Sequence, residues 1–305
     1  MRSMVRAPFL ALVSLLVPIA TQAQTQATCT FKFFSTKTNL TASNGSPVFL
    51  QPLGIDDFST VVGFGDRISA GEIGLVRWAN GGIVHVSGTK ALVARNDQGT
   101  MLGAVRVNST WQGVLVNGPT SSPTFTPLVL NIPLDPLAQV FPTGINKWGT
   151  VIGTYWNPDP TNSHGFKRWS NGTTHTLDFP GAAPSSTRPA GINDLGTVVG
   201  SYFDNKLNVV HGFIFHNGHY ATLDFPHASD TDLVGITNAG KIVGNAIVVD
   251  ATGRAFVHLF LYENGTFKII SIQGPKGLLS ISPKQGLILG ITGGASTPAF
   301  IAQCQ

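Results

Sequence analysis

Three histidines recur at equivalent places in successive sequence repeats and could form a ring of metal ligands. They are His164, His211 and His258, and imidazole is a common zinc ligand. Equivalent positions in successive units point the same way but lie well apart, and no Cys or carboxylate recurs beside them. We therefore predict structural histidines that donate to a neighbouring strand, and no metal site.

Two carboxylates also share a repeated slot, in the segment TLDFP. Asp178 and Asp224 occupy this slot in two units, and paired carboxylates can act as general acid and base. In other units the slot holds Ser271 or Ser87, so we predict strand-end caps instead.

The Asn/Asp pairs that open each repeat could bind calcium. One copy carries Lys147 and another carries Thr237 within this pair, so we interpret the pairs as turn formers. The sequence has no G-x-S-x-G, H-E-x-x-H, Walker A or paired C-x-x-C motif. We predict no catalytic residue and no cofactor.

The elements that must position these residues come from a decapeptide that is repeated along the chain. GINDLGTVVG starts at Gly191, and related segments start 40 to 50 residues apart. The six starts are Gly54, Ala94, Gly144, Gly191, Gly235 and Ile281. Each copy reads as two β-strands around a turn, in which Asn or Asp closes an Asx turn and Gly supplies a positive φ.

A second hairpin follows in most units, marked by Asn-Gly between alternating apolar residues. The pairs begin at Asn80, Asn117, Asn171, Asn217 and Asn264. Each unit is thus a predicted four-stranded antiparallel sheet, and small sheets repeated at this period bury their faces against one another. Bulky residues two positions before each pair would fill the inter-sheet space: Trp78, Leu115, Trp169, Phe215 and Tyr262. We predict an all-β, six-bladed β-propeller spanning residues 24–305 as one domain.

Closure of the ring is predicted from the two ends of the domain that spans residues 24–305. The sixth unit ends after its third strand, Pro298–Ala302, whereas an unassigned strand, Thr30–Phe34, precedes the first unit. Cys29 and Cys304 flank this junction, where other units place an Asn-Gly turn. We predict that the N-terminal strand completes the last blade and that a Cys29–Cys304 disulfide replaces the missing turn. Two free cysteines near flexible ends are the alternative.

The first residues indicate export. Arg2 and Arg6 precede the apolar run Pro8–Ala20, and Thr21–Ala23 fits a small-x-small cleavage site. We predict a signal peptide over residues 1–23, no membrane span, and a secreted or periplasmic protein. Loss of this leader would lower the net charge from +4 to +2. No Lys/Arg cluster suggests nucleic-acid binding, and we expect a monomer.

Several of these segments resemble the extracellular HAF-repeat proteins. The resemblance lies in GINDLGTVVGSYFD, GINKWGTVIGTYWN, the HGF tripeptides at His164 and His211, and the two TLDFP segments. It is strongest over residues 144–228. The resemblance implies an exported, repetitive β protein, mostly bacterial, with no assigned biochemical activity and no catalytic residue that can be carried over.

Two tryptophans are the candidate binding residues. Trp111 and Trp156 fall in the loop between the second and third strands of neighbouring units, on one face. Exposed, they would suit stacking on a glycan or a protein ligand; alternatively both indoles pack under the long connection Pro119–Pro142.

A binding or scaffolding module at the cell envelope or outside the cell is therefore our first functional hypothesis. A polysaccharide-active hydrolase or lyase is the second, and two carboxylates about 5 to 10 Å apart in a cleft lined by Trp111 or Trp156 would favour it. A structural or adhesive surface protein is the third.

Overall fold

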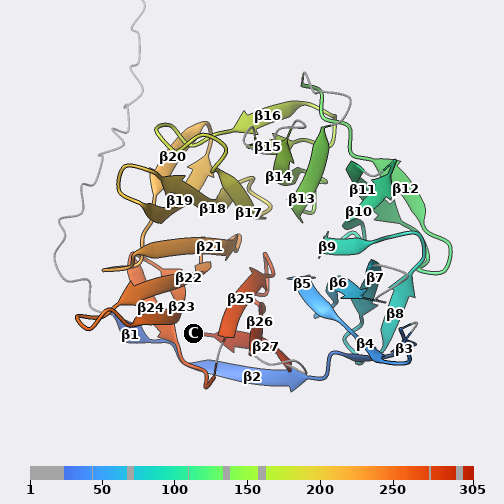
Figure 1. Cartoon of the computed structure of the whole chain (residues 1–305), viewed down its shortest axis with the longest axis horizontal. Helices are drawn as coiled ribbons and strands as arrows, with labels where there is room; N and C mark the ends of the chain where they lie inside the picture. Colours follow the sequence, from blue (N-terminus) through green and yellow to red (C-terminus); the bar gives the residue numbers. More distant parts are fainter. Residues whose placement is uncertain are drawn as a thin grey trace, which may run out of the picture.

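The computed structural model describes residues 24–42, 44–66, 72–108, 110–132, 138–156, 163–274, 276–292 and 298–305. The predicted signal peptide, residues 1–23, lies outside the described residues. The described strands form an all-β propeller, in which four-stranded antiparallel blades surround a central axis (Figure 1). The predicted all-β propeller and its four-stranded antiparallel blades are confirmed.

Four of the sheets stand alone, and in each the first strand of the repeat is innermost (Figure 1). The first contains β5 (Gln51–Ile55), β6 (Val61–Asp66), β7 (Glu72–Arg77) and β8 (Ile83–Val86). The second contains β9 (Ala91–Arg95), β10 (Met101–Val107), β11 (Thr110–Asn117) and β12 (Thr124–Pro127). The third contains β13 (Gln139–Ile145), β14 (Val151–Trp156), β15 (Ser163–Arg168) and β16 (Thr174–Leu177). The fourth contains β25 (Lys276–Ile281), β26 (Ile288–Thr292), β27 (Ala299–Cys304) and β2 (Cys29–Phe34).

A nine-stranded sheet contains two further antiparallel runs of four strands. One run is β17 (Arg188–Ile192), β18 (Val198–Asp204), β19 (Val209–His216) and β20 (His219–Thr222). The other is β21 (Asp230–Ile236), β22 (Ile242–Val249), β23 (Ala255–Glu263) and β24 (Thr266–Ile270), with β1 (Thr25–Gln26) parallel to β24. A single residue pair, Val210 with Asp230, joins the two runs. A two-stranded sheet, β3 (Lys37–Thr41) with β4 (Pro47–Phe49), follows the N-terminal strand.

The first turn of each repeat is built by its leading polar side chain. Asn146 Oδ1 accepts hydrogen bonds from the backbone N–H of Trp148 at 3.1 Å and of Thr150 at 3.0 Å. Its Nδ2 donates to the carbonyl of Asn193 in the next blade at 3.1 Å. Asn96 and Asn193 repeat both interactions. The predicted turn formers are confirmed, and they also connect neighbouring blades.

The hydrophobic core lies between blades, because each blade exposes two apolar faces that only its neighbours can cover. Phe215 is 4% exposed and packs in a cluster with Ile152 and Leu177 of the preceding blade. The equivalent residues Trp78, Leu115 and Tyr262 are half-buried against similar clusters, and Trp169 lies under the Lys167 ammonium. The predicted inter-blade role is confirmed for Phe215, Trp78, Leu115 and Tyr262.

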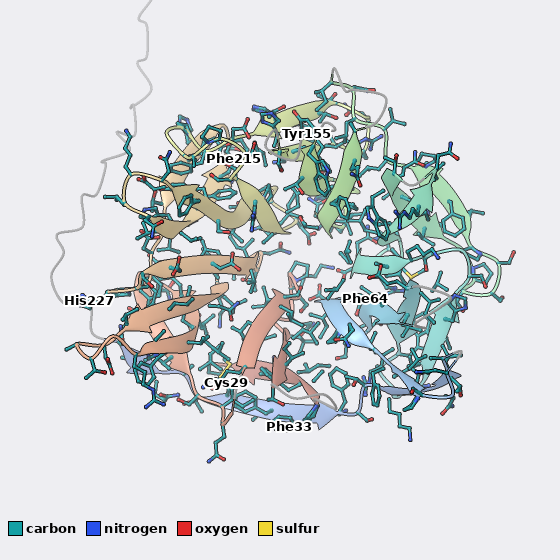
Figure 2. The ribbon with its side chains drawn as sticks, in the orientation of Figure 1. Cys29, Phe33, Phe64, Tyr155, Phe215 and His227 are labelled. Carbon is teal, nitrogen blue, oxygen red and sulfur yellow. A yellow bond between two sulfur atoms is a disulfide. The ribbon has the colours of Figure 1, made fainter. Side chains whose placement is uncertain are left out.

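Closure of the ring follows the predicted route. β2 pairs with β27 in antiparallel register from Cys29–Cys304 to Phe34–Ala299. The disulfide Cys29–Cys304 is formed, with an S–S distance of 2.03 Å and a sequence separation of 275. Figure 2 shows Cys29 at this junction between β2 and β27. Strand pairing and a covalent bond therefore both seal the ring.

Candidate functional site in the axial funnel

A cavity of about 570 Å³ lies at the end of the ring where the innermost strands begin. We call it the axial funnel. The strands β5, β9, β13, β17, β21 and β25 contribute to its wall, through Leu53, Val93, Thr143, Arg188, Asp232 and Leu279 among others. Its size falls within the range of small-molecule sites, about 300 to 1,000 Å³.

The charged groups of the funnel gather on one side, on β17 and β21. Arg188 and Ser201 lie opposite each other across the β17–β18 pair, and Asp230 and Asp232 follow on β21. Asp230 is held in place, because its Oδ1 accepts from Val210 N at 3.2 Å and its Oδ2 from Ser229 Oγ at 3.0 Å. The side chains of Arg188 and Asp232 are reached by solvent.

The surroundings of Asp232 perturb its pKa. The surrounding walls desolvate its carboxylate and raise its pKa, while a hydrogen bond from Ser201 and the positive charge of Arg188 partly oppose this shift. Desolvation by the funnel wall is the larger effect. The Asp232 carboxylate can accept hydrogen bonds from a polar ligand while the Arg188 guanidinium donates hydrogen bonds to it.

Apart from Thr143, the rest of the funnel wall is apolar. Leu53, Val93 and Leu279 come from the opposite blades, and Ile247 comes from the β22–β23 hairpin. Beyond Ile247 this hairpin exposes further apolar side chains, namely Val249, Phe256 and Val257, which are 47%, 39% and 47% exposed. The funnel therefore suits a ligand that has polar groups on one side and an apolar surface on the other.

The structure places the two candidate tryptophans on strands, so their predicted position in loops is wrong. Trp111 is the second residue of β11 and Trp156 the last residue of β14, because the hairpin strands extend further than the repeat pattern indicates. Residues 157–162, which follow Trp156, lie outside the described residues. Both indoles are half-buried.

Both tryptophans contact Phe141, and the three rings form one group that we call the aromatic ledge. Trp156 stacks on Phe141 with ring centroids 4.5 Å apart, and Trp111 lies 5.6 Å from the same ring. Gln139 Oε1 accepts from Trp111 N at 3.5 Å, and Gln139 pairs with Trp156 at the start of β13. The aromatic ledge thus lies at the same end of the ring as the axial funnel, but its tryptophans do not line that cavity.

The repeated histidines differ from prediction in one respect. A carboxylate does recur beside them: Nδ1 of His164 is 2.7 Å from Oδ2 of Asp178, and Nδ1 of His211 is 2.7 Å from Oδ2 of Asp224. Antiparallel pairing brings the start of the third strand beside the end of the fourth, which a reading of local sequence misses. Asp224 also accepts from Gly212 N at 3.1 Å, as expected of a strand-end cap.

His258 lacks this arrangement. Ser271 occupies the carboxylate slot in its unit, and the imidazole stacks on Phe225 at 5.7 Å. Within the described ranges no group of three or more His, Cys, Asp or Glu side chains is arranged to hold a metal ion. Over the same residues no helix has the length and apolarity needed to cross a membrane.

Sequence reasoning missed Arg188 and Asp232. Each lies three residues before the first glycine of its repeat, Gly191 or Gly235. The other units carry Gln51, Ala91, Phe141 and Leu278 at that position. The signal available in the sequence was a charged residue at a position where the other repeats carry uncharged residues.

The fold and the funnel define a class: an all-β propeller with four-stranded antiparallel blades and an axial cavity of ligand size. Neither a protein-family model nor a curated protein matches the chain. The putative TolB from Agrobacterium tumefaciens has a similar structure, with 10% identity and a TM-score of 0.53, over 92% of this chain and 99% of that one. The fucose-specific lectin from Aleuria aurantia is similar at 10% identity and a TM-score of 0.50, over 92% and 95%.

A further similar structure is longer. The chain spans 51% of puromycin hydrolase, with 12% identity and a TM-score of 0.48 over 81% of its own length. Identities this low establish the shared fold and nothing about the ligand.

Proposed function

We propose that this protein is an exported six-bladed β-propeller that acts as a binding or scaffolding module, with its ligand in the axial funnel. The count of six takes the two four-stranded runs of the nine-stranded sheet as separate blades, because a single residue pair joins them. One observation carries the proposal: Arg188 and Asp232 project from neighbouring innermost strands into the same cavity of about 570 Å³.

The ligand is a glycan or a polar segment of a protein. Arg188 offers several N–H donors in a planar fork, and the Asp232 carboxylate accepts from hydroxyl or amide groups. The apolar wall formed by Leu53, Val93 and Leu279 would cover the hydrophobic face of a sugar ring or a side chain. The aromatic ledge at the same end would add a stacking surface. The fold is compatible with such a role, because a fucose-specific lectin shares it.

Export is supported by the predicted leader and by the disulfide. Structural disulfides persist in oxidising compartments such as the periplasm and the extracellular medium, and Cys29–Cys304 joins the two ends of the mature chain. The HAF-repeat motifs support membership of that exported family. A ring that closes on itself also supports a monomer, since it leaves no blade to be completed by a second chain.

Binding of the purified mature protein to a glycan array and to a peptide library tests the proposal. We expect Arg188→Ala and Asp232→Asn each to weaken a positive signal at least tenfold. Trp111→Ala and Trp156→Ala should weaken it less, because neither indole lines the funnel. Asp178→Asn is the matched control, a carboxylate outside the funnel that pairs with His164. A signal that survives both funnel variants would refute the funnel as the site, and no signal at all would favour a structural or adhesive role.

An enzyme acting on polysaccharide is the second candidate. The observation that favours it is a pair of carboxylates, Asp230 and Asp232, two residues apart on β21 in one cavity. The raised pKa of Asp232 is the property that a general acid needs. Time-dependent release of reducing ends from a bound polysaccharide, abolished in Asp232→Asn, would establish catalysis. Binding without turnover would assign the module role.

A further inference from the structure

A cavity of about 240 Å³ lies between the blade that β2 completes and the blade formed by β5 to β8. We call it the junction cavity, because β2 and β27, the two strands that close the ring, form one of its walls. Figure 1 shows β2 as the outermost strand of its blade, running toward the first blade. The junction cavity shares no lining residue with the axial funnel, so it is a separate place on the molecule.

Arg77 is the buried charge of the junction cavity. It is the last residue of β7, lines the cavity and is only 8% exposed. Its Cζ lies 4.2 Å from the centre of the Phe34 ring, and its Nη1 donates to the carbonyl of Trp78 at 3.4 Å. A guanidinium carries five N–H donors. The part of the chain that the structure describes supplies no further acceptor and no carboxylate for them.

Arg168 occupies the equivalent position in the third blade and is satisfied differently. Like Arg77 it ends the third strand of its blade and precedes a tryptophan and an Asn-Gly turn. Its Nη1 donates to the carbonyl of Trp169 at 3.3 Å, and its Nε donates to the carbonyl of Val129 at 2.6 Å. Val129 belongs to the long connection that follows β12. Among the described residues no segment takes this part at Arg77, which lines a cavity instead.

The positive charge of the junction cavity is not compensated within it. The exposed Lys32 of β2 lines the cavity together with Arg77, and none of the described residues in its lining is acidic. Asp57, the acidic residue closest in sequence to the lining residue Ser59, binds backbone N–H groups of the loop after β25. Burial lowers the pKa of the Arg77 guanidinium, because a positive charge removed from water is unfavourable without a counter-ion. An anion in the cavity would supply that counter-ion.

The rest of the lining combines apolar side chains with neutral polar groups. Leu287 and Ile301 pack in the hydrophobic cluster between the two blades. Thr30 and Gln303 lie opposite each other across the β2–β27 pair, and Ser59 adds a hydroxyl group from the first turn of the neighbouring blade. A wall of this kind suits an anion that also carries hydroxyl groups and the C–H groups of a ring.

We propose that the junction cavity binds the carboxylate of an acidic sugar, a uronic acid, with Arg77 as its principal ligand. The planar guanidinium matches a carboxylate through two parallel N–H···O bonds, and the Lys32 ammonium adds a second positive charge. The hydroxyl groups of the sugar would meet the neutral polar side chains, and its C–H face would cover the apolar wall. The axial funnel is unsuited to the same ligand, because Asp230 and Asp232 repel an anion there.

Isothermal titration of the purified protein with sodium glucuronate tests the proposal. Glucose is the matched neutral sugar, and sodium acetate and sodium sulfate, at equal ionic strength, are anions without a sugar ring. We expect glucuronate to bind at one site per chain and to raise the melting temperature. Glucose, acetate and sulfate should each bind at least tenfold more weakly, because each lacks either the charge or the ring.

Variants locate the site. Arg77→Gln should weaken glucuronate at least tenfold, and Arg77→Lys should not restore the affinity, because an ammonium lacks the planar fork. Lys32→Gln removes an exposed charge and should weaken binding by about threefold. Arg168→Gln is the matched control, an arginine at the same position of another blade, and should bind glucuronate as the wild type does.

Absence of glucuronate binding at millimolar concentration would overturn the proposal, and so would glucose, acetate or sulfate binding as tightly as glucuronate. Binding that is kept in Arg77→Gln but lost in Arg188→Ala would place the anion in the axial funnel and overturn it as well. If Arg77→Gln folds poorly, Lys32→Gln decides, because unchanged affinity in that variant refutes the site.

Discussion

Removal of the Cys29–Cys304 disulfide is the most direct test of how the ring is held closed. The bond closes a loop with a sequence separation of 275. In the chain-entropy model a loop of this length stabilises the folded state by about 5 to 6 kcal/mol at 25 °C, and native disulfides of smaller domains are commonly worth about 2 to 5 kcal/mol. The free energy of unfolding of the double variant Cys29→Ala/Cys304→Ala should therefore be about 2 to 6 kcal/mol lower than that of the wild type.

The corresponding change in melting temperature follows from the size of the domain. An unfolding entropy of about 2.1 cal/mol/K per residue gives roughly 0.6 kcal/mol/K for the described domain, so the melting temperature should fall by about 3 to 10 °C. The double variant should still fold at 25 °C, because β2 keeps its antiparallel pairing with β27 and Phe34 stays buried.

Differential scanning calorimetry and urea unfolding, each with and without dithiothreitol, measure the effect. Reduced wild type should match the double variant, and the reductant should leave the double variant unchanged. A loss of less than about 1 kcal/mol in the free energy of unfolding would refute the argument. It would mean that the two ends stay paired in the unfolded ensemble even without the disulfide.

Three further outcomes are expected. Asn146 is 2% exposed, and its side chain accepts two hydrogen bonds and donates one. Asn146→Ala removes all three, so urea unfolding should show a free energy of unfolding lower by about 2 to 3 kcal/mol. Gly191→Ala places a Cβ 2.6 Å from Gly235 Cα and should cost about 1 to 3 kcal/mol in the same assay, while Gly277→Ala, with no atom within 4 Å of its added Cβ, should be near neutral. The pKa of Asp232 in the folded state is raised from 3.8, so this group favours the folded state below pH 3.8, and the contribution is lost as the pH rises through the folded pKa. Asp232→Asn should therefore melt at a higher temperature than the wild type at pH 7, and the difference should shrink between pH 7 and 4. A difference that does not depend on pH would contradict this assignment.

The repeat pattern predicted the blades because its information is local. Asn146 and Gly149 specify their turn within four residues, and Gly149 adopts a φ of 76° as expected. The closure could also be predicted, because the incomplete sixth unit and the unassigned N-terminal strand fit each other and carry one cysteine each. These inferences needed only the periodicity of the chain and the chemistry of tight turns.

The sites could not be predicted in this way. Arg188 and Asp232 are 44 residues apart in the numbering and belong to different units, and only the circular arrangement directs both into the axial funnel. Trp111 and Trp156 were separately visible in the sequence, but their contact through Phe141 depends on how two blades pack. The His–Asp pairs likewise required the alignment of a third and a fourth strand.

The sequence by itself determined the β-strands, the turns, the four-stranded unit and the pairing of the two cysteines, because each of these depends on residues within one repeat or on the mismatch between the chain ends. The tertiary structure decided which side chains share the axial funnel. An innermost strand brings only a few residues to the axis, so the funnel is assembled from segments that are distant in the sequence, and its charge depends on how the ring places them.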